Sequence, residues 1–134
     1  MSQANVEIVR TIYRALERGD YSSNEWADPD IEFVAPHEEH TLRGVEAMQR
    51  SWREFLSAWK DFKAEPEEII DAGEQVLVLD KLGGRGRGSG VPAEGLRGAS
   101  LFTFREGKVV RLAQYTDRAE ALKAVGLRRA EEGD

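Results

Sequence analysis

Apolar residues recur at helical spacing from the start of the chain. Over Gln3–Arg18 these positions are Val6, Val9, Ile12, Tyr13 and Leu16. Steps of three and four are typical of an amphipathic helix, and the Gly19-Asp20 pair would end it. Ser22 and Glu25 then form a Ser-x-x-Glu capping box, which predicts a short second helix closed by Pro29.

The clearest helical pattern covers Val45–Asp61. Its apolar positions alternate steps of three and four without a break, at Val45, Met48, Trp52, Phe55, Trp59 and Phe62. We expect this aromatic-rich stripe to pack on a sheet. In an alternative interpretation the stripe keeps that core role while some of its aromatic side chains also line a ligand cavity.

A β-prone pattern dominates the second half of the chain. A short strand at Ile31–Val34, ended by Pro36, comes before the long helix. After that helix the pattern predicts four strands, at Lys63–Asp71, Gln75–Arg87, Leu96–Arg105 and Lys108–Thr116. Glu106-Gly107 separates the last two, and a glycine that readily adopts positive φ predicts a tight hairpin there.

The last hairpin leads directly into a third helical signal. Asp117, with Glu120 three residues later, resembles a capping box that opens a helix, and Gly126 supplies its end. Helix capping is therefore the expected role of Asp117.

The run Val76–Leu79 is apolar at four consecutive positions, so both faces of its strand would need cover. One face would take the helices. A second subunit would cover the other face, and this predicts a homodimer.

Composition narrows the class of protein. With 134 residues, we expect a single domain over 1–127 and a frayed acidic tail over 128–134. There is no cysteine, so disulfides, thiolate catalysis and cysteine-bound metals are excluded. The net charge of −6 disfavours nucleic acid as a partner. No apolar stretch approaches the length of a membrane span, and the polar amino terminus favours a cytoplasmic protein.

Asp80 is the strongest candidate for chemistry because it directly follows the apolar run. A carboxylate in such a desolvated position has a raised pKa and can serve as a general acid or base. The alternative is a structural strand-end aspartate paired with Lys81, Arg85 or another arginine.

Two other motifs carry weaker signals. In His37-Glu38-Glu39-His40 the histidines are three apart rather than four, so no metal site is expected; His37 alone is a candidate acid or base. Gly83–Gly90 reads GGRGRGSG and fits neither a dinucleotide-binding nor a P-loop motif. It predicts a bulged, bent strand end, with Arg85 and Arg87 as possible anion contacts at a pocket mouth.

The order of these elements, with Gly19-Asp20, the aromatic helix and LFTFREGKVVRLAQYTD at Leu101–Asp117, resembles the SnoaL-like group. This group belongs to the nuclear transport factor 2-like superfamily, with ketosteroid isomerase, limonene epoxide hydrolase and scytalone dehydratase. The resemblance covers nearly the whole chain. It implies an α+β fold, in which a cone-shaped, curved mixed or antiparallel sheet wraps around helices, as in a cystatin-like roll. It also implies an apolar cavity and no cofactor.

The resemblance also suggests where site residues would fall. The ketosteroid isomerase tyrosine would fall at Ile12, with Tyr13 adjacent but rotated off that face, and the base and the protonated aspartate at Ala35 and Ser100. These three departures speak against steroid isomerisation. The Arg-x-Asp of limonene epoxide hydrolase would fall at Val78 and Asp80, and its second aspartate at Gln114. Asp80 and Gln114 would then face each other across the cavity.

These considerations predict a pocket protein for a small hydrophobic or polyketide-like molecule. Asp80 would act as acid or base, with Gln114, Ser100 and His37 orienting the substrate for isomerisation, dehydration, cyclisation or hydrolysis. The expected apolar lining is Ile12, Leu16, Phe33, Trp52, Phe55, Trp59 and Phe102. The alternative is a non-catalytic binding or dimerisation module in which Asp80 is structural.

Overall fold

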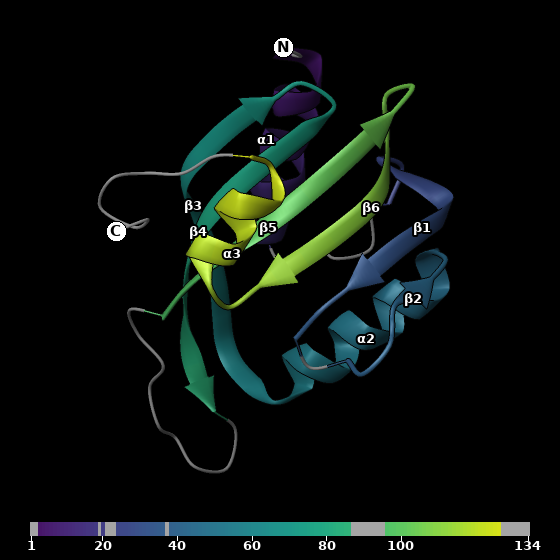
Figure 1. The fold of residues 1–134 in the computed structure, drawn as a ribbon. Coiled ribbons are helices and arrows are strands. Elements are labelled where there is room, and N and C mark those ends of the chain that lie inside the picture. The colour runs from purple at the N-terminus through teal and green to yellow at the C-terminus, as the bar shows by residue number, and fades with distance from the viewer. Residues whose placement is uncertain (1–2, 19, 21–23, 37, 87–95, 127–134) are drawn as a thin grey trace.

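One curved sheet, flanked by helices on both faces, organises the chain (Figure 1). The computed structural model describes residues 3–18, 20, 24–36, 38–86 and 96–126, without the side chains of residues 60, 61, 85, 86 and 96. Its elements are α1 (Gln3–Glu17), β1 (Ala27–Val34), β2 (Leu42–Arg43), α2 (Val45–Ser57), β3 (Trp59–Ala72), β4 (Gln75–Gly86), β5 (Leu96–Arg105), β6 (Lys108–Tyr115) and α3 (Arg118–Ala124).

The strands of this sheet follow the order β2-β1-β6-β5-β4-β3. Neighbouring strands pair antiparallel except β1 and β6, which are parallel. β3 to β6, the four strands predicted after the long helix, therefore form an antiparallel meander, and β1 joins its far edge from the first half of the chain. The α+β class with a curved mixed sheet is confirmed.

Alternation along β4 divides the core into two parts. Val76 and Val78 point to the side of α1 and α2, where the larger cluster lies. Leu77 and Leu79 point to the opposite side and pack in a second cluster with Leu122 of α3. Figure 1 shows the short helix α3 lying across that second face of the sheet.

This placement of α3 removes the argument that predicted a homodimer. The second apolar face of β4 is buried within the chain itself, with Leu77 and Leu79 both inaccessible to solvent. Two-faced apolarity of β4 therefore no longer supports a homodimer.

The predicted hairpin and cap are confirmed. Glu106 and Gly107 both have positive φ, 51° and 79°, which is the backbone of the tight turn expected between β5 and β6. The Asp117 side chain accepts a hydrogen bond from the backbone nitrogen of Ala119 at 2.9 Å and so caps α3. Gly126, at φ 75°, follows the end of this helix.

The predicted short helix closed by Pro29 is wrong. Asn24–Trp26 leads through a turn into β1, and Pro29 lies within that strand. The pairing of β1 with β6 shifts register between Ala27 and Glu32, so Pro29 falls where the ladder is interrupted. A proline costs no ladder hydrogen bond at such a place.

The predicted end of the long helix is also wrong. α2 ends at Ser57, and Trp59 already belongs to β3, where it pairs with Gly86. The aromatic stripe is continuous across this boundary because Phe55, Trp59 and Phe62 remain in mutual ring contact at 5.2 to 6.1 Å. The spacing of aromatic residues therefore persisted beyond the helix and gave no signal of its end.

The glycine-rich end of β4 is irregular where the structure describes it. The β3–β4 register shifts between Lys60 and Lys63, opposite Gly84, whose φ is 149°. This agrees with the predicted bulged strand end. Arg87 and the rest of that motif lie outside the described residues, as do His37 and the predicted tail at 128–134. Among the described helices, none has the length and apolarity needed to cross a membrane.

Candidate functional site

Asp80 lies on β4, on the face of the sheet that meets α1. Only 4% of its surface is exposed. The strand register sets Val78 opposite Ser100 of β5, and Ser100 opposite Gln114 of β6. Asp80, Ser100 and Gln114 are thus brought onto one patch of one sheet face by three different strands.

Two hydroxyl groups hold the Asp80 carboxylate. Tyr13, from the middle of α1, donates to Oδ1 at 2.6 Å, and Ser100 donates to Oδ2 at 2.9 Å. Among the described residues no cationic side chain forms an ion pair with this carboxylate. The carboxylate is therefore satisfied by neutral donors alone.

Burial has the largest effect on the pKa of Asp80. Desolvation raises the pKa of Asp80 from 3.8 to about 6. The hydrogen bonds from Tyr13 and Ser100 and the charge of Arg118 act in the opposite direction but only partly offset it. Burial, together with the neighbouring carboxylate, also raises the pKa of Tyr13 well above 10, so its hydroxyl remains a donor near neutral pH.

Arg118, the first residue of α3, fixes the backbone beneath Asp80. Its Nη2 donates to the backbone oxygen of Asp80 at 2.7 Å, and its Nε donates to that of Gly98 at 3.1 Å. The same Nη2 also contacts Glu67 Oε1 at 2.5 Å. One guanidinium thus joins β3, β4, β5 and α3, and its charge faces the back of Asp80 rather than the carboxylate.

A cavity of about 230 Å³ opens beside Asp80 and Ser100. Its polar lining also includes Tyr13, Gln114 and Thr116. The other lining residues are mainly apolar: Leu16, Pro36, Trp52, Phe55, Leu56, Phe62, Ala64, Leu82, Gly98, Ala99 and Tyr115. Within the described residues the Gln114 amide makes no hydrogen bond, so it is available to a ligand. The cavity is an apolar chamber with a few polar groups gathered around one buried carboxylate.

The structure brings together most of the residues that the sequence singled out. Asp80, Ser100, Gln114, Leu16, Trp52 and Phe55 all line the Asp80 cavity. Phe33 and Phe102 instead lie in the core, and Trp59 packs on Phe55 and Phe62 without lining the cavity. Ile12 lines a different cavity, the outer cavity, which lies between α1 and Trp26.

Tyr13 corrects an expectation drawn from the resemblance. It was expected to be rotated off the pocket-facing side of the first helix, with Ile12 on that side. In the structure Tyr13 reaches Asp80, while Ile12 faces the outer cavity. Successive helical residues differ by about 100° around the axis, so the two neighbours can serve two different cavities.

Arg118 was also missed. The sequence showed a capped helix start immediately before it, but nothing that linked this position to the backbone of β4. The described residues contain no group of three or more His, Asp or Glu side chains that could hold a metal ion.

A curved mixed sheet wrapped around helices, with an apolar cavity, defines a protein of the nuclear transport factor 2-like class. The family model of the SnoaL-like domain matches residues 9–112. The chain therefore belongs to the SnoaL-like domain family. No curated protein sequence matches it.

Several solved structures share this fold. A nuclear transport factor 2-like protein of unknown function from Burkholderia pseudomallei is 23% identical with a TM-score of 0.77, covering 94% of this chain and 99% of that one. A proposed SnoaL-like polyketide cyclase from Jannaschia is 19% identical with a TM-score of 0.77, covering 96% and 98%. A proposed polyketide cyclase from Sinorhizobium meliloti is 28% identical with a TM-score of 0.66, covering 84% and 99%.

Proposed function

We propose that this protein binds a small, mostly apolar, carbonyl-bearing molecule of polyketide type and that Asp80 catalyses a proton transfer on it. The observation that carries this proposal is the position of Asp80, a buried carboxylate in the wall of an apolar cavity with its pKa raised to about 6. An acid or base with a pKa near the working pH transfers protons efficiently in both directions. The fold family, whose neighbours include two proposed polyketide cyclases, supports the same ligand class.

The proposed step begins with Asp80 ionised, as most of it is at neutral pH. Asp80 removes a proton from the carbon next to a substrate carbonyl. The electron pair of the broken C–H bond moves to the carbonyl oxygen and forms an enolate. In a cyclisation, the enolate carbon then attacks a second carbonyl of the same molecule. The new alkoxide takes back the proton from Asp80, which returns Asp80 to its ionised form. No external oxidant or reductant is required.

The neighbouring polar groups suit this step. Tyr13 and Ser100 hold the carboxylate in place through their hydroxyls, so it does not have to be oriented during the reaction. Gln114, whose amide makes no hydrogen bond within the described residues, would donate a hydrogen bond to the oxygen on which charge develops. His37, an expected orienting residue, lies outside the described residues.

The proposal can be tested with 2-tetralone, a compact aromatic ketone whose acidic C–H positions exchange with D2O. We expect the protein to accelerate deuterium incorporation, followed by NMR. Asp80→Asn should slow the catalysed exchange about 100-fold or more, because the base is lost. Asp30→Asn, which changes an exposed aspartate of β1, is the matched control and should retain the wild-type rate.

A second candidate function is ligand binding without catalysis. It is favoured by one observation: both oxygens of Asp80 already accept hydrogen bonds, which tie α1 to β4 and β5. Binding of 2-tetralone, seen as a raised Tm, with exchange no faster than in buffer would support this candidate over the enzyme. If the protein neither binds 2-tetralone nor accelerates its exchange, the proposed ligand class is wrong.

A further inference from the structure

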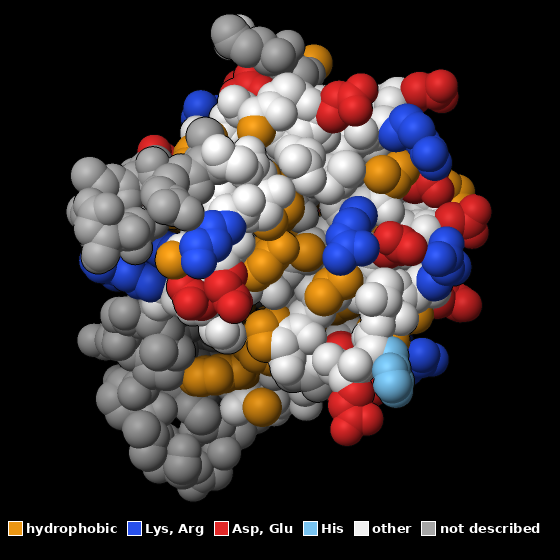
Figure 2. Space-filling model, in the orientation of Figure 1, with side chains coloured by type: hydrophobic (Ala, Val, Ile, Leu, Met, Phe, Trp, Pro, Cys, Tyr) orange, Lys and Arg blue, Asp and Glu red, His pale blue; other side chains and the backbone are white. Residues whose placement is uncertain are grey.

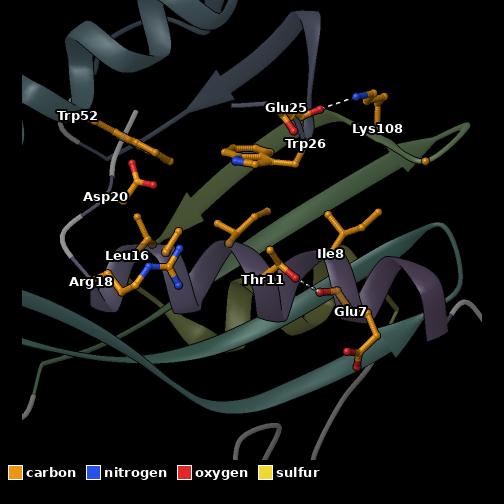
Figure 3. A pocket seen from close by; sticks show the side chains of 13 residues that line it. Glu7, Ile8, Thr11, Leu16, Arg18, Asp20, Glu25, Trp26, Trp52 and Lys108 are labelled. Carbon is orange, nitrogen blue, oxygen red and sulfur yellow. Dashed lines mark hydrogen bonds between the residues drawn. The ribbon is translucent and has the colours of Figure 1, made fainter. Parts of the chain in front are cut away.

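The outer cavity lies between α1 and the two tryptophans Trp26 and Trp52. Its volume is about 440 Å³, larger than that of the Asp80 cavity. α1 forms its floor, and the opposite wall comes from Trp26, Trp52 and the start of β6 at Lys108 (Figure 3). This cavity has no role in the chemistry described above.

The side chains of α1 divide this cavity into an apolar floor and a polar rim. Ile8, Ile12 and Leu16, each four residues apart, form one row along the helix. Glu7 and Thr11 begin a second row one residue earlier, at the rim. From Ile8 to Leu16 the helix rises about 12 Å, so the floor is an elongated groove rather than a round pocket.

Two tryptophan rings face this groove and are held in place by the core. Trp26 and Trp52 stack on each other with centroids 6.2 Å apart. Each also makes an edge contact with a buried ring, Trp26 with Phe102 and Trp52 with Phe33. The aromatic wall is therefore rigid before any ligand arrives, which lowers the entropic cost of binding.

The rim carries charges of both signs. Glu7, Asp20 and Glu25 are acidic, while Arg18 and Lys108 are basic. Lys108 donates to the backbone oxygen of Glu25, which fixes one end of the rim (Figure 3). Such a mixed rim gives no preference for a strongly charged ligand, so the groove suits an extended apolar group.

The two cavities meet at one wall. Leu16 and Trp52 line both of them. Figure 3 shows these two side chains at one end of the outer cavity, with Ile8 and Lys108 at the other end. A ligand that passes between Leu16 and Trp52 would have one end at Asp80 and the other along α1.

We propose that the outer cavity binds the apolar tail of the molecule whose reactive end lies at Asp80. The ligand class is thereby narrowed to elongated molecules with a compact carbonyl-bearing head and an extended aliphatic or aromatic tail. This inference rests on the proposed function only for the position of the head at Asp80. The tail is bound by the residues that line the outer cavity.

The test compares two probes, 2-tetralone and its 6-hexyloxy derivative, which adds an apolar tail to the same head. For each protein variant the measured quantity is the ratio of the two Kd values. In the wild type we expect the tail to improve binding about tenfold or more, because it buries several CH2 groups. Ala15→Trp should fill the groove near Leu16 and remove this gain, since Ala15 lines only the outer cavity.

Two further variants complete the design. Glu17→Trp places the same side chain on an exposed position of α1 that lines neither cavity, and its Kd ratio should equal that of the wild type. Ile8→Trp fills the far end of the groove and gives an independent test should Ala15→Trp fail to fold. Ile8→Trp should also reduce the affinity that the tail adds.

The outcomes separate this inference from the proposed function. If the tail gives no gain in affinity, or the same gain in the Ala15→Trp and Ile8→Trp variants as in the wild type, the outer cavity does not hold the tail. Catalysed exchange of 2-tetralone would in that case still support the role of Asp80. If the gain is present and lost in both variants while no exchange occurs, the groove is a binding site and the catalytic proposal is wrong. If neither probe binds, both ideas are overturned.

Discussion

Tyr13 and Ser100 set the ionisation of Asp80 as well as its position. Both hydroxyls donate to the carboxylate, which favours its charged form and opposes the effect of burial. The strength of the base that we propose at Asp80 therefore depends on two neutral neighbours, Tyr13 from α1 and Ser100 from β5. Within the described residues this carboxylate forms no ion pair, which is consistent with the proposed proton transfer.

Removing one of these donors should raise the pKa of Asp80 further. In Tyr13→Phe the carboxylate loses its 2.6 Å hydrogen bond while the burial remains. We expect the pKa to rise above about 6, measured by NMR titration of the 13C-labelled carboxyl group. The lost buried hydrogen bond should lower the free energy of unfolding by about 1–3 kcal/mol.

Tyr115→Phe is the matched control for this experiment. Tyr115 lines the same cavity but makes no hydrogen bond to Asp80 in the described part of the chain. Its variant should titrate like the wild type. An unchanged or lowered pKa of Asp80 in Tyr13→Phe would show that the hydroxyl does not stabilise the charged carboxylate.

At the scale of secondary structure, the strands were the most predictable elements. β5 begins and ends where the sequence pattern placed it, and the positive-φ turn at Glu106-Gly107 directly follows its last residue. The boundary of α2 was not predictable, since Phe55, Trp59 and Phe62 keep one aromatic cluster across a change from helix to strand. The spacing of apolar residues cannot distinguish a helix from a strand when the same aromatic rings stay in contact across the boundary.

The candidate site was predictable only where strand order determined it. Asp80 followed a strongly apolar strand, and the antiparallel register then brought Ser100 and Gln114 beside it. Tyr13 required the rotation of α1 against the sheet, and Arg118 required the packing of α3 below β4. Both depend on tertiary contacts between elements far apart in the sequence, which no local pattern encodes.

Arg118 gives the next prediction at this scale, because it connects three strands with a helix. Arg118→Met should raise the pKa of Asp80, since the arginine charge lowers it, and should also raise that of Glu67. Arg118→Lys keeps the charge and should change the pKa of Asp80 much less. Both values are accessible in the same carboxyl NMR titration.

Arg97→Met is the control for Arg118. Arg97 is largely exposed and pairs with the same Glu67 at 3.6 Å, but makes no contact with the backbone of Asp80. Its loss should leave the Asp80 titration unchanged. A folded Arg118→Met variant with an unaltered Asp80 pKa would contradict the view that this guanidinium acts on the site.

At the scale of the whole molecule, the oligomeric state stays a proposal. Leu77 and Leu79 are covered by α3, so their burial does not require a partner. Figure 2 shows, however, that hydrophobic side chains still reach the surface between charged ones on this side of the molecule. We retain the homodimer and expect light scattering at micromolar concentration to give twice the chain mass of 15.0 kDa. A monomeric mass would overturn it.

The stability of the whole fold should depend on the protonation of Asp80. Its folded-state pKa of about 6 is above its ordinary value of 3.8, so the native state holds the proton more tightly than the unfolded state does. This contribution is fully present below pH 3.8. It is lost as the pH rises towards 6, because the unfolded chain releases its proton first. The difference between the folded and unfolded pKa values of Asp80 corresponds to about 3 kcal/mol in the free energy of unfolding.

Asp80→Asn isolates this contribution because asparagine does not titrate and can still accept one of the two hydroxyl hydrogen bonds. Other carboxylates contribute to both profiles, Glu67 with a lowered pKa among them, and cancel in the comparison. Relative to wild type, the variant should therefore gain about 2.4 kcal/mol in the free energy of unfolding between pH 4 and pH 7, measured by urea denaturation at a series of pH values. Asp30→Asn should run parallel to wild type over that range. A pH-independent difference between Asp80→Asn and wild type would mean that the folded state does not hold Asp80 in a desolvated form, and the basis for its catalytic role would be lost.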